Sequence, residues 1–283
     1  MAHWGIITAA LTPFTADGSV DEDAFVALCS YLLDNGSDGF VVAGTTGEGA
    51  TLTDDEKLRL FELAVSEFKG RATIVAGTGS NDTAHTVHLT EQATEIGCDA
   101  MLCVTPYYNK PNFRGLVGHY EAIAAATDRP IVLYNIPSRC VVDISNDELA
   151  RLAAIPHVSA VKQARYEDIQ PIDGLDLLAG NDDVLAEVLD KGGAGGITVA
   201  SHLVGPEMRR MIDEPEARAE IHVALTPIFK AMSVTTNPIP VKTAMRLLGH
   251  RVGGFRLPMV DASEEEEEVI RGALEQHGLL SAV

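Results

Sequence analysis

The stretch 158–164, Val-Ser-Ala-Val-Lys-Gln-Ala, is a short apolar run that carries a lysine near its end. Runs of this kind are typical of buried strands in parallel sheets. The lysine, Lys162, either extends its amine into solvent or is buried. Burial lowers the pKa of an amine and leaves it free to attack a carbonyl group and form a Schiff base. The segment alone leaves both interpretations open.

The same alternation of short apolar runs and amphipathic stretches continues along the chain. The predicted strands are Gly5–Ala10, Gly39–Ala43, Thr73–Ala76, Ala100–Val104, Pro130–Tyr134, Val158–Lys162, Leu175–Leu178 and Gly195–Val199. The predicted helices between them are Asp21–Asn35, Thr53–Phe68, Thr83–Ile96, Phe113–Thr127, Asp147–Ala153 and Asp182–Lys191. Strands alternating with helices indicate a parallel sheet with crossover helices. Eight units fit an α/β protein of the (β/α)8 TIM barrel type, with a doubly wound sheet as the alternative.

The last part of the chain contains only helical patterns, at 216–232, 240–248 and 264–277. We therefore expect residues 1–214 to form the barrel with the active site. Residues 215–283 form a C-terminal helical region suited to packing on the barrel and to subunit contacts. The acidic run Glu264–Glu268 is interpreted as the solvated first turn of the last helix, where carboxylates stabilise the helix dipole.

Composition excludes several classes of protein. The 283 residues are 46% hydrophobic and carry a formal net charge of −20, which repels nucleic-acid phosphates. No apolar run is long enough for a membrane span, and residues 1–5, Met-Ala-His-Trp-Gly, do not resemble a secretion signal, so we expect a cytoplasmic protein. The cysteines Cys29, Cys98, Cys103 and Cys140 form no metal-binding pattern and are expected to be buried thiols.

Polar residues collect where the predicted strands end. In a parallel barrel these ends and the loops after them hold the reacting groups. They read GTTGE at 44–48, TPYYNKP at 105–111, YNIPSR at 134–139, Lys162, GND at 180–182 and GGITV at 195–199. The glycine-rich turn at 44–49 lacks the lysine of a phosphate-binding loop, which makes a nucleotide site improbable.

These residues suit Schiff-base chemistry on a 2-oxo acid. Linked tyrosine and threonine hydroxyls can carry the protons that carbinolamine formation requires. Arg139 can hold a carboxylate with two hydrogen bonds, and the turn amides of 44–46 can hold another. No metal is needed, since the protonated imine is the electron sink. Each residue also has an ordinary structural interpretation: Tyr107 and Tyr108 as a packing pair, and Arg139 as a surface ion pair.

Together with NPIPVK at 237–242 and GGITVAS at 195–201, these motifs resemble the pyruvate-dependent class I aldolase family, which includes dihydrodipicolinate synthases and N-acetylneuraminate lyases. The resemblance covers almost the whole chain. It is strongest to the synthase branch, whose members condense pyruvate with L-aspartate 4-semialdehyde on the diaminopimelate and lysine pathway. It implies a lyase without a cofactor, with pyruvate held covalently, and a homotetramer built as a dimer of dimers.

The resemblance also implies roles for individual residues. Lys162 forms the imine with pyruvate. Tyr134 acts as the general acid and base, relayed through Thr46 to Tyr108. Tyr107 interlocks with the neighbouring subunit near the site.

Binding roles follow in the same way. Thr45 and Thr46 bind or orient the pyruvate carboxylate, while Gly180 and Ile197 line the site with backbone groups. Arg139 holds the carboxylate of the semialdehyde. This arginine is the main feature that separates the synthases from the sugar-acid lyases.

The chain departs from the family pattern at some positions. Gln163 stands where the synthases usually carry Glu or Asp, and Gly49 stands where Ser is common. In the region that resembles the lysine feedback site, Asn81 is retained. Asp54, Lys57 and His85 stand where lysine-sensitive enzymes tend to have His, His and Glu. With histidine at position 85 in place of that Glu, the ammonium group of a bound lysine molecule has no carboxylate to pair with at this position. We therefore expect weak or absent inhibition of the enzyme by free lysine.

Three hypotheses remain open on the sequence: the synthase, another pyruvate-dependent aldolase acting on a sugar acid or hydroxy-oxo acid, and a barrel without catalytic activity. Assays with the candidate substrates separate the first two. Borohydride reduction in the presence of pyruvate tests the third, because only the enzymes form an adduct on Lys162.

Overall fold

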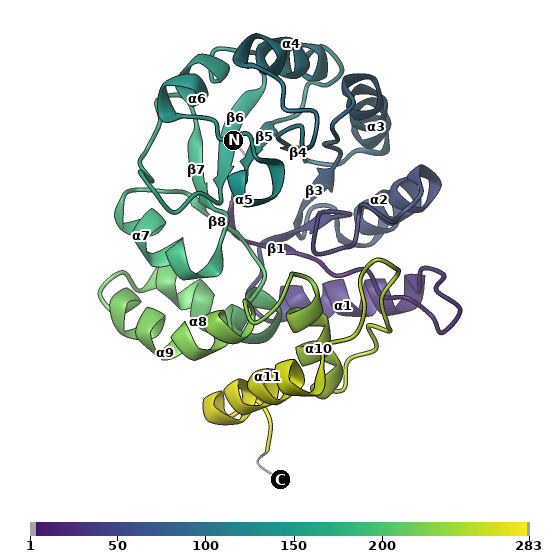
Figure 1. Cartoon of the computed structure of the whole chain (residues 1–283), viewed down its shortest axis with the longest axis vertical. Helices are drawn as coiled ribbons and strands as arrows, with labels where there is room; N and C mark the ends of the chain where they lie inside the picture. The colour runs from purple at the N-terminus through teal and green to yellow at the C-terminus, as the bar shows by residue number, and fades with distance from the viewer. Residues whose placement is uncertain (1–3, 282–283) are drawn as a thin grey trace.

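The computed structural model describes residues 4–281 as a closed barrel of eight parallel strands, ordered β1 to β8 around the ring (Figure 1). Met1–His3 and Ala282–Val283, the outer ends of the two predicted regions, lie outside the described residues. The strands are β1 Gly5–Ala9, β2 Gly39–Val42, β3 Thr73–Gly77, β4 Ala100–Val104, β5 Ile131–Asn135, β6 Val158–Gln163, β7 Asp176–Ala179 and β8 Gly195–Thr198. The barrel is the predicted (β/α)8 fold, and the doubly wound alternative is wrong because β1 pairs with β8.

Helices surround the strands and continue beyond them at the C-terminal end (Figure 1). Their bounds are α1 Glu22–Asp34, α2 Asp54–Phe68, α3 Thr83–Ile96, α4 Phe113–Ala124, α5 Pro137–Cys140, α6 Asn146–Leu152, α7 Leu185–Asp190, α8 Ser201–Asp213, α9 Arg218–Ala231, α10 Ile239–Leu247 and α11 Glu264–His277, with a 3-10 turn η1 at Asp182–Val184. Capping boxes begin α2 at Thr53 and α11 at Ser263. The acidic first turn predicted for the last helix is confirmed.

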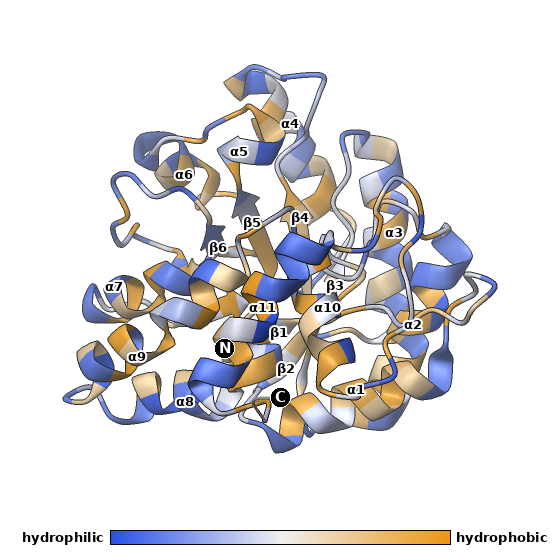
Figure 2. Ribbon diagram, turned by 60° about the horizontal axis from the view of Figure 1, so that its bottom comes forward, coloured by the Kyte–Doolittle hydropathy of each residue, from blue (hydrophilic) through white to orange (hydrophobic). Residues whose placement is uncertain are grey.

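Strand residues alternate between two apolar layers, as the period of two requires. One set points into the barrel and includes Ile7, Val41, Val132 and Leu178. The other set packs against the helices, whose hydrophobic faces turn inward while their hydrophilic faces turn outward (Figure 2). Because the barrel interior is filled with side chains, a pocket can form only at its ends.

The predicted elements agree with the structure to within three residues at each end, and two helices, α5 and α8, were missed. No bounds were predicted for α8, which contains Pro206 and a non-helical Val204 with φ −128°. Proline is unfavourable in the interior of a helix, so its presence in the sequence argues against a continuous helix there. Helix α5 is a single turn inside the YNIPSR segment and is too short to show a period. All four cysteines are buried free thiols, as expected.

Candidate active site

The register of two neighbouring strands brings the predicted nucleophile and the predicted proton carrier together. In the pairing of β5 with β6, Tyr134 lies opposite Lys162. Residues that are paired in this way point to the same face of a sheet, and both side chains point into the upper end of the barrel. The amine Nζ of Lys162 lies 4.2 Å from the centroid of the Tyr134 ring.

Lys162 is buried, with 5% of its surface exposed. Burial lowers the pKa of its amine to about 7, because the charged form loses its hydration; the carboxylate of Asp182 opposes this shift and the charge of Arg139 adds to it. Within residues 4–281 no hydrogen bond or ion pair holds the amine. The interpretation of Lys162 as a buried amine is therefore the one that the structure favours, and the solvent-extended alternative is wrong.

Burial also raises the pKa of the Tyr134 hydroxyl, and the nearby positive charge of Arg139 opposes that rise. The hydroxyl therefore keeps its proton near neutral pH and can donate it. An amine that is uncharged and a phenol that is protonated are the pair that addition to a carbonyl requires.

A pocket of about 790 Å³, counted with its open mouth, lies over these two residues at the carboxyl ends of the strands. The turn after β2 contributes Thr45 and Thr46, and Gly180 follows β7. A Cβ atom at position 180 would lie 2.6 Å from the backbone of Gln163, so the close approach of the two chains requires glycine there. Arg139, on α5, completes the set of predicted residues that line the pocket.

Part of the pocket wall comes from the C-terminal helical region. Phe229 lies on α9, and Met232, Ser233 and Asn237 follow it. Asn237 donates a hydrogen bond of 3.0 Å from Nδ2 to Oγ1 of Thr46. The backbone carbonyl oxygen of Asn237 accepts a hydrogen bond of 3.3 Å from Nη2 of Arg139. Asn237 therefore connects Thr46 and Arg139, the two groups that are expected to bind carboxylates. The sequence shows NPIP as a motif but gives no sign of this contact.

Three predicted site residues lie away from the pocket lining. Ile197 is fully buried in β8, among the side chains that fill the barrel below the pocket. Tyr108 is 88% exposed and Tyr107 is 39% exposed. Within the described chain, no direct hydrogen bond joins Tyr134 to Thr46 or Thr46 to Tyr108.

The structure also brings residues into the site that were not predicted. Asp182 lines the pocket, and its carboxylate accepts hydrogen bonds from the amides of Val199 at 2.8 Å and Ala200 at 3.1 Å. Burial raises its pKa to about 6, against the effect of these two bonds. Asn181 and Tyr166 lie beside it in the lining. Asp182 stands in the GND motif, which was the one sequence signal that could have identified it.

Known proteins of similar sequence and structure agree on one family. Residues 2–277 match the model of the dihydrodipicolinate synthetase family. The chain belongs to this family. It is 44% identical to the 4-hydroxy-tetrahydrodipicolinate synthase of Moorella thermoacetica, over 98% of this chain and 100% of that protein.

Solved structures of family members superpose closely on the chain. The DHDPS of Cyanidioschyzon merolae, solved with lysine bound, has a TM-score of 0.93 at 39% identity and covers 98% of this chain and 99% of its own. The chloride-inhibited dihydrodipicolinate synthase of Acinetobacter baumannii, complexed with pyruvate, has a TM-score of 0.94 at 33% identity. It covers 99% of this chain and 100% of its own.

Two departures from the family pattern have a structural explanation. The amide of Gln163 faces away from the pocket, where its Oε1 accepts a hydrogen bond of 3.1 Å from Nδ2 of Asn135. It therefore does not contact a ligand bound at Lys162. A Cβ atom on Gly49 would lie 2.1 Å from the carbonyl oxygen of Ala43, so a larger residue here would require a shift of the turn.

The structure contains a second buried lysine, which the sequence analysis did not single out. Lys242 lies on α10 and its side chain is fully buried. Its amine lies 2.7 Å from Oε1 of Glu48, the last residue of the GTTGE motif. The two residues are far apart in the sequence, so no local pattern connects them.

Neither a metal site nor a membrane span is evident in the part of the chain that the structure describes. Residues 4–281 hold no group of three or more His, Cys, Asp or Glu side chains that could bind a metal ion. None of the helices described there is long and apolar enough to cross a membrane.

Proposed function

We propose that this chain is a 4-hydroxy-tetrahydrodipicolinate synthase, a lyase that condenses pyruvate with L-aspartate 4-semialdehyde through a Schiff base on Lys162. Membership of the dihydrodipicolinate synthetase family supports the class of reaction. The observation that carries the proposal is the buried amine of Lys162, with a pKa of about 7, beside the protonated Tyr134.

The first half of the reaction, the formation of the imine, uses the amine of Lys162 and the hydroxyls of Tyr134 and Thr46. The neutral amine of Lys162 adds to the keto carbon of pyruvate, and Tyr134 gives a proton to the carbonyl oxygen as it becomes a hydroxyl. Loss of that hydroxyl as water leaves the protonated imine. Thr46, a buried residue of the pocket lining, would return a proton to Tyr134 and connect it to Tyr108.

The second half forms the carbon–carbon bond. A methyl proton passes to the hydroxyl relay of Tyr134, which converts the imine to an enamine. The enamine carbon attacks the aldehyde of the second substrate, and the relay gives the proton to the aldehyde oxygen, which becomes a hydroxyl. The amino group of that substrate then attacks the imine carbon, which closes the ring and releases Lys162 as the free amine. Arg139 lies at the pocket mouth and would hold the carboxylate of the semialdehyde, while Thr45 and Thr46 hold that of pyruvate.

A substrate assay with Arg139→Ala tests the proposal. The parent protein should consume pyruvate with the semialdehyde and should give no retro-aldol activity on sialic or deoxy-gluconic acids. Arg139→Ala should lose at least about tenfold in kcat/KM for the semialdehyde, because a charge-assisted pair to its carboxylate is removed. Borohydride with pyruvate should still trap the adduct on Lys162. Cleavage of a sugar acid by the parent would instead favour the lyase alternative.

The exposed tyrosines support a proposal about assembly. Tyr107 and Tyr108 lie on the loop after β4, and Tyr108 and Lys110 have positive φ angles of 69° and 49°. Exposed aromatic side chains on a constrained loop are suited to contact with another subunit. We infer a homotetramer in which Tyr107 reaches the neighbouring site. Sedimentation of the parent and of Tyr107→Ala tests this, since a parent that remains a monomer would contradict it.

The side chains at 54, 57 and 85 support the expectation of weak inhibition by lysine. Asp54 accepts a hydrogen bond of 2.9 Å from Nε2 of His85, and Nζ of Lys57 lies 3.5 Å away. The only carboxylate of this group is therefore already paired within the chain. Steady-state assays with added lysine test the expectation, and a submillimolar inhibition constant would refute it.

A further inference from the structure

The turn 44–48, which presents Thr45 and Thr46 to the pocket, is held from behind by buried charges. Glu48 ends the turn with a positive φ of 53°, and its side chain points away from the pocket. Its carboxylate accepts a hydrogen bond of 2.7 Å from Nζ of Lys242 and one of 3.1 Å from the amide of Arg256. The side chains of Glu48 and Lys242 are 2% and 0% exposed.

Lys242 fixes several segments of the barrel end at once. Its amine also donates to the carbonyl oxygen of Thr12 at 3.0 Å and lies 4.3 Å from the centroid of the Phe14 ring. Thr12 in turn donates from Oγ1 to the carbonyl oxygen of Gly47 at 2.6 Å. The loop after β1 and the turn after β2 therefore share one buried cation.

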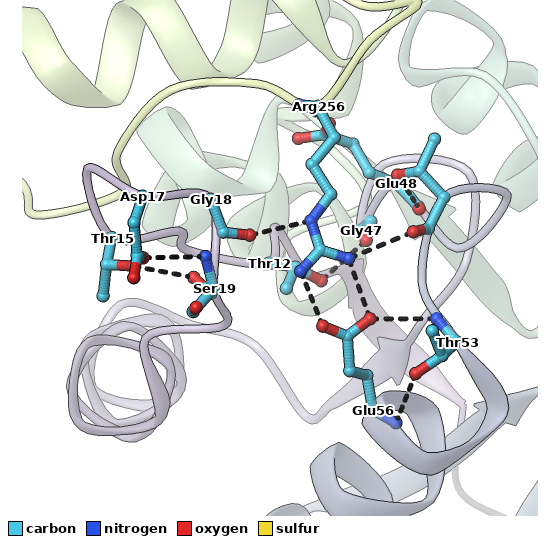
Figure 3. A network of polar contacts seen from close by, with 11 residues as sticks. Thr12, Thr15, Asp17, Gly18, Ser19, Gly47, Glu48, Thr53, Glu56 and Arg256 are labelled. Atoms are coloured by element: carbon cyan, nitrogen blue, oxygen red, sulfur yellow. Dashed lines mark hydrogen bonds and ion pairs between the residues drawn. The ribbon is translucent and has the colours of Figure 1, made fainter.

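Arg256 extends this arrangement outward (Figure 3). Its guanidinium binds both carboxylate oxygens of Glu56, at 2.6 and 2.8 Å, and the carbonyl oxygens of Gly18 and Thr51. The turn is thus bounded on its far side by the first turn of α2.

Helix α10 connects the buried charge to the pocket. Lys242 lies in its first turns, and the chain just before the helix carries Asn237. Asn237 binds Thr46 directly and accepts a hydrogen bond from Arg139. One short segment therefore holds the turn from behind through Lys242 and from the pocket side through Asn237.

We propose that Glu48 and Lys242 are positioning residues that set the place of Thr45 and Thr46 relative to Lys162 and Arg139. This inference rests on the proposed function, since it concerns the site for the pyruvate carboxylate. Neither residue lines the pocket, so their effect on the reaction passes through the turn. A fixed distance between the carboxylate site and the nucleophile is what makes attack on the keto carbon fast.

Two variants test this positioning role. One replaces both charged side chains of the Glu48–Lys242 pair by neutral ones, and the other shortens the acid at position 48. Removing one charge alone would leave the other buried without a partner and could unfold the chain. The double variant Glu48→Gln/Lys242→Met avoids this, and Glu48→Asp keeps both charges but draws the turn inward by one methylene. We expect KM for pyruvate to rise roughly tenfold or more in both, because small displacements of binding groups are costly. Adduct formation at saturating pyruvate and its pH dependence should not change, since the surroundings of Lys162 are intact.

The matched control removes an ion pair elsewhere. Arg218 binds Asp190 at 2.5 Å and joins α9 to α7 away from the turn. Asp190→Asn/Arg218→Met should lower thermal stability and leave KM for pyruvate unchanged. The positioning role is overturned if Glu48→Asp folds and keeps KM for pyruvate within about twofold of the parent. If the double variant does not fold, Glu48→Asp decides alone. A parent that forms no pyruvate adduct would contradict the proposed function instead, which keeps the two failures distinct.

Discussion

Two buried lysines lie on opposite sides of the turn 44–48 and differ in the contacts that their amines make. Lys162 and Lys242 are 5% and 0% exposed, and their amines lie 4.2 Å and 4.3 Å from the centroids of aromatic rings. Burial lowers the pKa of both amines. Lys242, however, faces a carboxylate at 2.7 Å that opposes the shift. Lys162 has no hydrogen-bond partner in the described part of the chain.

By this comparison the partner, and not burial, is what distinguishes Lys162, the proposed nucleophile, from Lys242, a structural cation. A paired ammonium keeps its proton and connects chain segments, while an unpaired one in the same medium loses its proton and becomes reactive. Four predictions follow this distinction, in order of the expected effect.

Loss of the nucleophile gives the largest effect. Lys162→Met should reduce synthase activity by about 10³-fold or more, because the covalent route is removed. Mass spectrometry after borohydride reduction with pyruvate should find no adduct. Lys230→Met, which changes an exposed lysine outside these motifs, should keep both activity and adduct. An adduct on Lys162→Met protein would show that another amine is the nucleophile.

Methionine at the two positions should change stability in opposite directions. Lys242→Met leaves Glu48 buried without its partner and should lower the free energy of unfolding by about 3–5 kcal/mol. Lys162→Met removes an amine that is costly to bury, so it should raise the free energy of unfolding. Urea denaturation at neutral pH measures both. If both substitutions lowered the free energy of unfolding equally, the distinction between a paired Lys242 and an unpaired Lys162 would be contradicted.

The stabilising effect of Lys162→Met should depend on pH. The pKa of Lys162 is about 7 in the folded chain and 10.5 in its ordinary state. Below pH 7 the lysine is charged in both states, so the folded state bears the full cost of burying the charge, of the order of a few kcal/mol. Between the two pKa values the cost shrinks as pH rises, and above 10.5 it is gone. Unfolding of parent and variant at pH 6 and pH 10 should therefore differ more at pH 6.

Adduct formation should follow the same titration. The initial rate of borohydride trapping at fixed pyruvate should rise with pH and reach half its maximum near pH 7, where half of the Lys162 amine is free. Asp182→Asn removes a negative charge that raises this pKa, so its midpoint should move to lower pH. Asp173→Asn, at an exposed acid that does not line the pocket, serves as the control. A midpoint that stays the same in Asp182→Asn would exclude Asp182 as an influence on the amine.

The sequence predicted much of the barrel and part of the site. Strand and helix positions follow from local periods, and Val158–Gln163 is a short, mostly buried segment with two β-branched valines, which favours a strand. Arg139, Gly180 and the threonines of the turn were found because strand ends meet at one rim. Asp182 and Asn237 were missed as site residues, since their contacts are made only after the chain folds.

By itself, the sequence determined that Lys162 ends an apolar strand among other strand-end polar groups. Tertiary structure alone decided that, among residues 4–281, no hydrogen bond or ion pair holds the amine of Lys162 while Glu48 holds that of Lys242. Glu48 and Lys242 are separated by 194 positions, and they meet because α10 packs against the turn after β2. Local periods arise from backbone geometry, which each segment carries with it. A pKa depends on which distant groups surround an amine, and packing sets those surroundings.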